Sequence, residues 1–174
     1  MERKIFMKNH AKCEEILHYI CQNQEPGKKM VQKLMYLMER RGINLGLNYS
    51  IHFYGPYSAS LDDTLHTLEA QGIINITIDH LTHKITITDK NHCPQALNEN
   101  EKKTAFTVLD YFEKKSAADL EAYTTLDFVA HTMLKDEGSE EQVIRDVLKI
   151  KSKKFTYEEL LEKYRTMKQL GYIA

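Results

Sequence analysis

The sequence has few of the residues that interrupt or cross-link a chain. Its 174 residues include seven Gly, three Pro, three Cys and no Trp. So little Gly and Pro leaves few sites for long loops, and regular secondary structure should therefore dominate. Three irregularly spaced cysteines do not make a disulfide framework, which favours a reduced, cytoplasmic setting. The length allows one domain, or two very small domains that share a core.

A marked excess of either charge is also missing. The chain has 24 Lys and Arg against 25 Asp and Glu, a net charge of −1, which removes the simplest argument for a nucleic-acid or membrane-surface protein. One stretch, residues 42–61, lacks charged residues but contains three Gly and one Pro, so we do not expect it to span a bilayer. The charged N-terminal residues show no secretory signal. We therefore expect no membrane contact.

The two signs of charge are nevertheless separated along the chain. Residues 1–41 hold nine basic and five acidic side chains, and residues 149–174 hold seven basic and three acidic ones. The blocks between them, 55–101 and 102–148, have net charges of −5 and −4. Lysine runs are usually solvated turns, but if the two basic ends meet in space they form one positive face for phosphate or an acidic partner. The candidate basic face comprises Lys28, Lys29, Lys33, Arg40, Arg41, Lys151, Lys153 and Lys154.

Apolar periodicity divides the N-terminal half into helices and short strands. The spacing of apolar residues predicts three helices, and alternating β-rich segments predict one strand and a hairpin. Gly55-Pro56 is expected to turn the chain after the single strand. The order helix, helix, strand, helix, hairpin is that of a winged helix-turn-helix. The predicted helices cover residues 9–23, 28–41 and 58–71, the strand 49–54, and the hairpin strands 73–79 and 84–88.

Capping signals predict that the C-terminal half is helical throughout. Ser116, Ser139 and Thr156 are each followed three residues later by an acidic or amide side chain, the pattern in which two helix-terminal amides are satisfied reciprocally. The fold class is therefore α+β and mainly helical. We expect residues 1–92 to form a winged-helix-like module, and residues 93–174 a helical module packed on it in one compact unit. The predicted C-terminal helices cover residues 101–114, 117–135, 140–149 and 157–170.

The sequence contains no arrangement of residues typical of catalysis. It has no G-x-S-x-G nucleophile motif and no Gly-rich phosphate loop. Cys13 and Cys21 lie on the apolar side of a predicted helix, where cysteine usually acts as a small core residue. We therefore predict a protein that is not an enzyme and that needs no cofactor.

Four potential metal ligands lie around the predicted hairpin. His80 and His83 are in its turn, and His92 and Cys93 follow its second strand, so together they could close a tetrahedral zinc site. However, no pair has the Cys-x-x-Cys spacing, and adjacent residues such as His92 and Cys93 are unusual ligands for one ion. We favour a polar turn without metal, and metal binding by these four residues stays open as the alternative.

A winged helix is often a DNA-binding module, and its reading helix can be tested for charge. The helix before the hairpin, residues 58–71, is the one that normally enters the major groove. It carries Asp62, Asp63 and Glu69 and no Lys or Arg. Because DNA binding requires a basic surface that contacts phosphates, these acids disfavour it. A winged-helix transcriptional regulator that uses the basic ends instead is the alternative function.

Three motifs carry a resemblance to known proteins. They are Lys33-Leu34-Met35-Tyr36-Leu37, Tyr54-Gly55-Pro56-Tyr57-Ser58, and Lys151-Ser152-Lys153-Lys154-Phe155. In these motifs the chain resembles the YwgA-like bacterial proteins and, more distantly, the Panacea-domain group, which includes phage-associated and antitoxin proteins. The likeness covers residues 28–74 and 125–173, and the Tyr-Gly-Pro-Tyr-Ser turn is its most specific part. Ser152 stands where that pattern has a proline.

The resemblance implies a function that depends on binding. The YwgA-like likeness implies no particular activity, whereas Panacea-domain proteins are thought to be antitoxins that neutralise an unrelated toxin by direct contact. We therefore predict a non-enzymatic, cytoplasmic regulatory protein that binds a protein partner and is antitoxin-like or associated with phage or defence. The candidate partner-binding residues are Tyr54, Gly55, Pro56, Tyr57 and Ser58.

The same five residues also have a purely structural explanation. Exposed tyrosine is favoured at protein interfaces, which supports a binding role. Alternatively, Gly55 supplies an unusual backbone angle, Pro56 fixes the next one, and Tyr54 and Tyr57 pack the start of the following helix. The sequence does not decide between the two interpretations.

Overall fold

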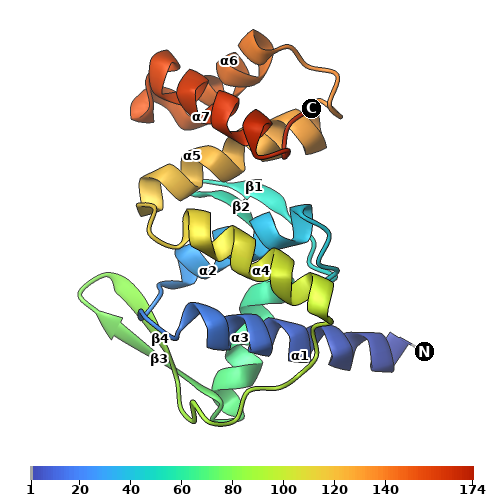
Figure 1. Cartoon of the computed structure of the whole chain (residues 1–174). Helices are drawn as coiled ribbons and strands as arrows, with labels where there is room; N and C mark the ends of the chain where they lie inside the picture. Colours follow the sequence, from blue (N-terminus) through green and yellow to red (C-terminus); the bar gives the residue numbers. More distant parts are fainter. Residues whose placement is uncertain (1) are drawn as a thin grey trace. The chain divides into compact units, whose positions relative to one another are not determined.

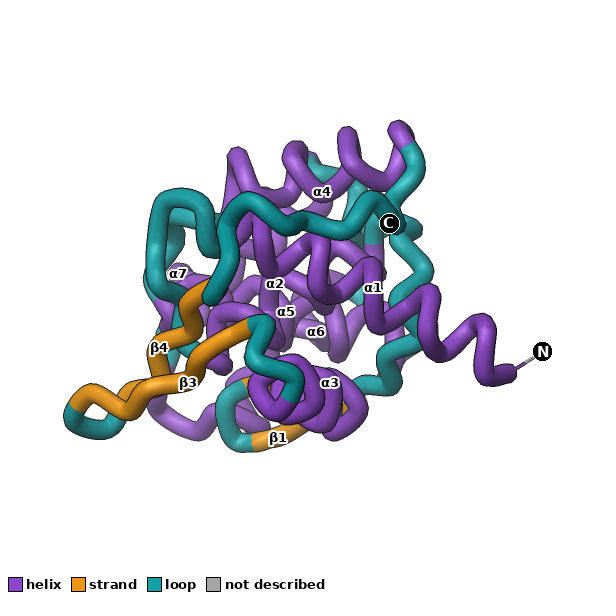
Figure 2. Tube along the Cα trace, turned by 90° about the horizontal axis from the view of Figure 1, so that it is seen from below, coloured by secondary structure: helices purple, strands orange, loops and turns teal. Residues whose placement is uncertain are grey.

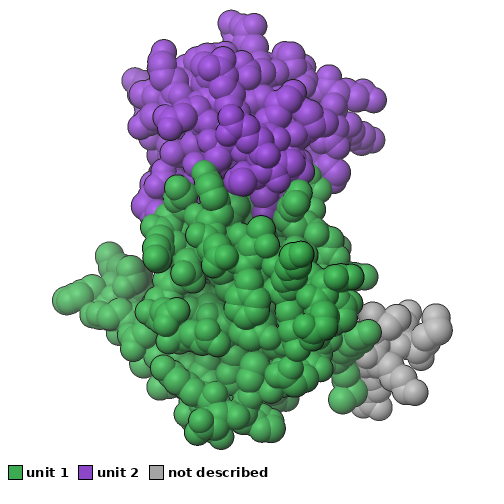
Figure 3. Space-filling model, viewed as in Figure 1, with its two compact units in different colours: residues 1–49, 58–115 green, residues 50–57, 116–174 purple. Residues whose placement is uncertain are grey.

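The fold was analysed in a computed structural model that describes the backbone of residues 2–174 and the side chains from residue 7 onward. The protein is α+β and mainly helical, with two small antiparallel sheets, as predicted. Its residues form two compact units, the first made of residues 1–49 and 58–115 and the second of residues 50–57 and 116–174 (Figure 3). The chain therefore passes between the units three times.

Unit 1 is built around a helix that is buried on almost every side. The second helix, α2, contacts α1, α4 and the second strand of the hairpin (Figure 1). All eight of its residues from Val31 to Met38 are buried, as expected for the central helix of a core. The elements of unit 1 are α1 (Glu2–Ile20), α2 (Lys28–Arg40), α3 (Ala59–Ala70), β3 (Ile74–Asp79), β4 (Thr82–Ile87) and α4 (Glu99–Phe112).

The β3–β4 hairpin extends from the helices of unit 1. Figure 2 shows it projecting beyond α2 and α3. Ile74 and Ile85 are buried at its base, while Ile78 and Leu81 near its tip are 74% and 99% exposed. The predicted hairpin is therefore confirmed, with a tighter turn of two residues, His80 and Leu81.

A buried carboxylate joins α1 to the segment that leads into α4. Glu15 is fully buried, and its Oε2 accepts hydrogen bonds from the backbone N–H groups of Ala96 and Leu97 at 2.6 and 2.8 Å. Its Oε1 accepts a hydrogen bond from the hydroxyl of Tyr19 at 2.5 Å. Because a buried charge is tolerated only when it is hydrogen-bonded, these three donors explain why Glu15 can lie in the core.

Unit 2 is likewise built around one buried helix. Every residue of α5 from Leu120 to Asp127 is buried, and α5 contacts α6, α7 and β2. The helix continues directly into a π-helical turn, η1, so that the predicted helix over 117–135 is present with a change of hydrogen-bond pattern at Phe128. The elements of unit 2 are β1 (Ser50–His52), β2 (Gly55–Tyr57), α5 (Ala117–Asp127), η1 (Phe128–Met133), α6 (Glu140–Lys151), η2 (Ser152–Lys154) and α7 (Tyr157–Gln169).

The predicted helix starts are confirmed by the caps. The hydroxyls of Ser116, Ser139 and Thr156 each accept a hydrogen bond from the backbone N–H three residues later. At Thr156 the cap is fully reciprocal, because Glu159 also bonds back to the N-cap backbone. The same reciprocal cap begins α4, from Asn98 to Glu101, so that helix starts two residues earlier than predicted.

The region around Gly55 differs from the prediction. Gly55-Pro56 was expected to be the turn, which is wrong: these residues begin β2, and the turn consists of Phe53 and Tyr54. Ser50 pairs with Tyr57, and His52 with Gly55. Pro56 is tolerated in this strand because a two-stranded sheet leaves an outer edge that needs no amide donor.

The first strand, β1, is not part of the same sheet as the β3–β4 hairpin. β1 pairs with β2, and β3 pairs with β4, in two separate sheets. The units do not coincide with the predicted modules 1–92 and 93–174, because α4 packs against α2 in unit 1 and the β1–β2 sheet packs against α5 in unit 2. Among residues 2–174, no helix is both long and apolar enough to cross a membrane.

We predict that Glu15→Ala lowers the free energy of unfolding by about 3 kcal/mol, because it leaves two buried backbone N–H donors without an acceptor. Chemical denaturation followed by circular dichroism measures this. Glu14→Ala is the matched control: the neighbouring side chain is half-buried, and a loss within about 0.5 kcal/mol is expected. Equal losses for both variants would contradict the role of Glu15.

Candidate partner-binding surface at the Phe53–Tyr54 turn

Two aromatic side chains project from the turn of the β1–β2 hairpin. Phe53 is 82% exposed and Tyr54 is 45% exposed. Their rings meet edge to face, with centroids 5.0 Å apart and planes at 83°, an arrangement that aromatic pairs favour. Gly55 follows with φ of +95°, a backbone angle at which a side chain would be strained. The turn therefore presents two large aromatic side chains at a fixed place.

Most of the predicted binding segment is inside the protein. Gly55 and Pro56 are buried, and Tyr57 is half-buried with its ring 4.9 Å from that of His52. Ser58 is fully buried, belongs to unit 1 and caps α3 by accepting a hydrogen bond from the N–H of Leu61. Only Tyr54 of the five is exposed. Gly55, Pro56 and Ser58 are thus covered by the protein itself, and the binding role predicted for the segment stays a prediction.

Sequence reasoning missed Phe53, the most exposed aromatic residue that the structure describes. The prediction placed it inside a strand, where an aromatic residue is expected to pack against neighbours. The available signal was Gly55, because a glycine two positions after Phe53 is compatible with a tight turn formed by the two residues before it. Because the turn lies at residues 53–54 and not at 55–56, Phe53 is in the turn and not inside the strand.

A buried lysine holds the backbone of this turn. Lys151, at the end of α6, donates a hydrogen bond from Nζ to the carbonyl oxygen of Phe53 at 2.6 Å and lies 3.4 Å from that of His52. Its side chain is only 2% exposed. Fixing two consecutive carbonyl groups at the start of the turn limits its motion, so Lys151 orders the segment that carries the exposed rings.

The charge of Lys151 is balanced by an equally buried carboxylate. Glu121 of α5 lies with Oε1 3.0 Å from Lys151 Nζ, and its side chain is 5% exposed. This contact is an ion pair without a well-aligned hydrogen bond, since Oε1 has no hydrogen-bond partner. Burial lowers the pKa of Lys151, and the nearby Glu121 opposes that effect. The lysine would be costly to bury without this carboxylate.

A second lysine connects Glu121 to the exposed surface. Lys154 Nζ lies 2.6 Å from Glu121 Oε2 and 5.6 Å from the centre of the Tyr54 ring, within the range of a cation–π contact. Lys153 beside it is exposed. We call the four residues Phe53, Tyr54, Lys153 and Lys154 the tip surface.

The predicted basic face is divided between the two units. Lys28, Lys29, Lys33, Arg40 and Arg41 are in unit 1, and Lys151, Lys153 and Lys154 are in unit 2. Lys33 and Lys151 are buried, so they do not lie on an exposed surface. Lys28 is neutralised by Asp62, with Nζ 3.0 Å from Oδ1. Of the eight residues, the structure places Lys151 and Lys154 beside the Phe53–Tyr54 turn, and the exposed Lys153 precedes Lys154 in the chain.

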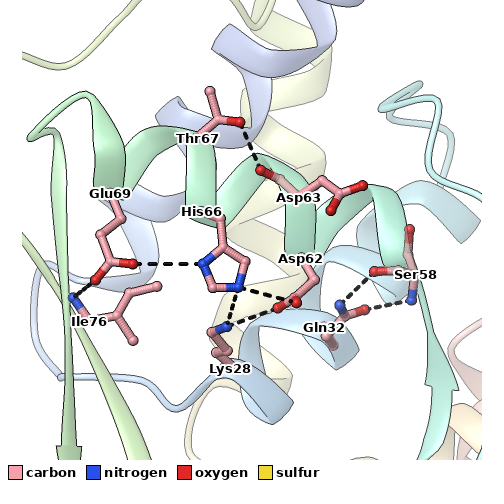
Figure 4. Close-up of polar contacts among 9 residues, drawn as sticks. All are labelled: Lys28, Gln32, Ser58, Asp62, Asp63, His66, Thr67, Glu69 and Ile76. Carbon is pink, nitrogen blue, oxygen red and sulfur yellow. Dashed lines mark hydrogen bonds and ion pairs between the residues drawn. The ribbon is translucent and has the colours of Figure 1, made fainter.

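The helix before the hairpin, α3, carries three acidic residues, of which Asp63 is exposed and Asp62 and Glu69 are half-buried. Figure 4 shows Asp62, His66 and Glu69 along α3, with Lys28 of α2 pointing toward Asp62. His66 lies 3.5 Å from Asp62 and 3.7 Å from Glu69, and Glu69 also accepts a hydrogen bond from the N–H of Ile76 in β3. These contacts tie α3 to its neighbours and leave it without a basic side chain for phosphates.

The start of α3 is fixed by a second contact seen in Figure 4. The Gln32 side chain accepts a hydrogen bond from the Ser58 N–H and donates one to the Ser58 carbonyl oxygen, both at 2.9 Å. All of these atoms are buried. Gln32 therefore satisfies the backbone at the point where the chain re-enters unit 1.

The four potential metal ligands do not converge. Among the residues that the structure describes, no three His, Cys, Asp or Glu side chains gather as a metal site. His80, His83 and His92 are exposed, and Cys93 is half-buried. Burial raises the pKa of Cys13 and Cys21 to about 12, so neither thiol is prepared to act as a nucleophile.

We predict that Glu121→Ala lowers the free energy of unfolding by about 3–5 kcal/mol, because it removes the counterion of buried Lys151. Thermal and chemical denaturation measure the loss. Glu162→Ala, at an exposed position of α7, is the matched control, with an expected change within about 0.5 kcal/mol. If the two variants were equally stable, Glu121 would not carry the role assigned to it.

Comparison with known proteins does not assign the chain to a family. No protein-family model matches it, and no curated protein sequence matches it. The resemblance to YwgA-like and Panacea-domain proteins therefore stays a prediction that depends on the motifs given above.

Proposed function

We propose that this protein is a non-enzymatic regulatory protein that acts by binding a protein partner through the tip surface. The observation that carries the proposal is the exposure of Phe53 and Tyr54 on a turn whose carbonyl groups are held by buried Lys151. Aromatic side chains provide much of the binding energy at protein interfaces. A turn that is already ordered loses little conformational entropy on binding.

The arrangement of the tip supports a binding role over a purely structural one. A side chain that only stabilised the fold would be buried, whereas 82% of the Phe53 surface is open to solvent. Burying a phenylalanine in an interface contributes about 1.5–3 kcal/mol. The protein thus keeps an exposed apolar group at a position where a partner could cover it.

We further propose that the regulation is antitoxin-like or associated with phage or defence. This part depends on the resemblance to the Panacea-domain group, whose antitoxins are thought to neutralise toxins by direct binding. The tip surface overlaps two of the resembling motifs, because Tyr54 belongs to one and Lys153 and Lys154 to another. In the folded chain these motifs lie side by side.

A DNA-binding regulator is the second candidate function. We propose that the helices and the β3–β4 hairpin of unit 1 form a winged-helix-like scaffold, in which β1 takes no part because it pairs with β2 in unit 2. Asp62, Asp63 and Glu69 on α3 disfavour DNA in its major-groove position. Lys153 and Lys154 would have to contact phosphates instead, and such binding would weaken steeply with salt.

The proposal is tested with the double variant Phe53→Ala, Tyr54→Ala. We expect its affinity for the partner that co-purifies with the wild-type chain from host cells to fall about thirtyfold or more, the effect of losing an interface aromatic worth about 2 kcal/mol. Calorimetry with the purified partner measures it. The control is Leu81→Ala, which removes an exposed apolar side chain from unit 1 and should leave affinity unchanged.

Two results would contradict the proposal. One is an unchanged affinity of the double variant. The other is that no specific protein partner is found and the chain instead binds duplex DNA. If that DNA binding weakens from low to moderate salt and is lost in the double variant Lys153→Glu, Lys154→Glu, the second candidate function would be established.

A further inference from the structure

The lysines of the tip carry more positive charge than the protein neutralises. Lys151 and Lys154 share the single carboxylate of Glu121. Lys153 adds a third positive charge, and its exposed ammonium has no ion-pair partner among residues 7–174. Two of three positive charges are therefore without a counterion within unit 2. Excess charge of one sign beside an apolar group favours a partner of the opposite sign.

The backbone is bent at the point that presents these lysines. Ser152 ends α6 with φ of 51° and ψ of −128°, a conformation that residues with a side chain rarely adopt and that costs free energy. The following residues, Lys153 and Lys154, then make a single 3-10 turn. Without this bend α6 would continue and carry its next lysines around the helix. After the bend, Lys154 lies beside the Phe53–Tyr54 turn instead.

We infer that the tip surface binds an acidic segment of the protein partner, in which an apolar side chain covers Phe53 and neighbouring carboxylates contact Lys153 and Lys154. This inference rests on the proposed function and specifies the chemistry of the partner. Glu121 carries one negative charge and already pairs with Lys151, so it does not fully balance the positive charge of Lys154. A carboxylate of the partner near Lys154 would balance the remainder.

The chemistry of the tip favours carboxylates over a nucleic acid. Single-stranded nucleic acids bind where several aromatic faces are open for base stacking. Here Lys154 lies over the Tyr54 ring and Phe53 meets the same ring edge to face, so Tyr54 is already engaged. The tip also has no arginine, the residue whose planar fork suits phosphate.

The partner segment can be identified by photo-crosslinking in host cells. Phe53→p-benzoylphenylalanine keeps the ring and places the reactive group at the tip, and Leu81→p-benzoylphenylalanine places it at an exposed control position in unit 1. We expect a protein adduct at position 53 only, whose crosslinked peptide contains at least two Asp or Glu residues beside an apolar one. Adducts with nucleic acid, lipid or a second copy of this chain would overturn the inference.

The charge requirement is then measured with a synthetic peptide of the crosslinked segment. We expect the Lys153→Glu variant to bind this peptide about tenfold more weakly than the wild-type chain does. A peptide in which Asn and Gln replace Asp and Glu should also bind about tenfold more weakly. Added salt should weaken the binding of the original peptide. Lys168→Glu makes the same charge change on α7 and should have no effect. Lys153 is exposed, so its replacement leaves the fold intact.

Different results would contradict the proposed function and the inference about the acidic partner segment. If no protein adduct forms at position 53, the proposed function itself is wrong. If an adduct forms but binding is indifferent to Lys153→Glu, to the peptide carboxylates and to salt, the protein binds a partner at the tip and the inference about its acidic character is wrong.

Discussion

The buried ion pair between Glu121 and Lys151 is the contact on which the candidate surface depends. It joins the central helix α5 to the end of α6, and through Lys151 it reaches the carbonyl groups of the Phe53–Tyr54 turn. A buried pair of this kind adds little net stability, but removing either partner leaves a charge in a low-dielectric site. It therefore fixes one arrangement of three separate segments. The exposed rings of Phe53 and Tyr54 are placed by that arrangement.

Unit 1 also contains a buried glutamate, but its contacts differ from those of Glu121. Glu15 is as deeply buried as Glu121, but its partners are backbone N–H groups and a tyrosine hydroxyl, all inside the unit. Through Tyr19, whose ring centroid lies 4.7 Å from that of Phe106, this network also contacts an aromatic residue that is 43% exposed. In unit 2 one carboxylate serves two lysines, of which one is buried and the other reaches the surface. In unit 2, the lysine that reaches the surface lies with its Nζ 5.6 Å from the centre of the Tyr54 ring.

The sequence predicts local structure here better than it predicts the site. Caps such as Ser116 and Thr156 are recognisable because their hydrogen bonds span three residues. The Glu121–Lys151 pair spans 30 positions and the Lys151–Phe53 contact spans 98, so neither leaves a local pattern. Lys151 was grouped with surface lysines because charge alone does not reveal burial. Phe53 was missed because the turn was placed two residues too late.

We propose that Lys151 serves partner binding by holding the turn that carries Phe53. A double-mutant cycle on partner affinity tests it most directly, with Lys151→Met, Phe53→Ala and the combined variant. Lys151→Met keeps the length of the side chain, and Glu121 retains Lys154 as its partner. Our account predicts that Phe53→Ala loses most of its effect once Lys151 is replaced, since the turn is then no longer ordered. An equal loss of affinity from Phe53→Ala in both backgrounds would contradict it.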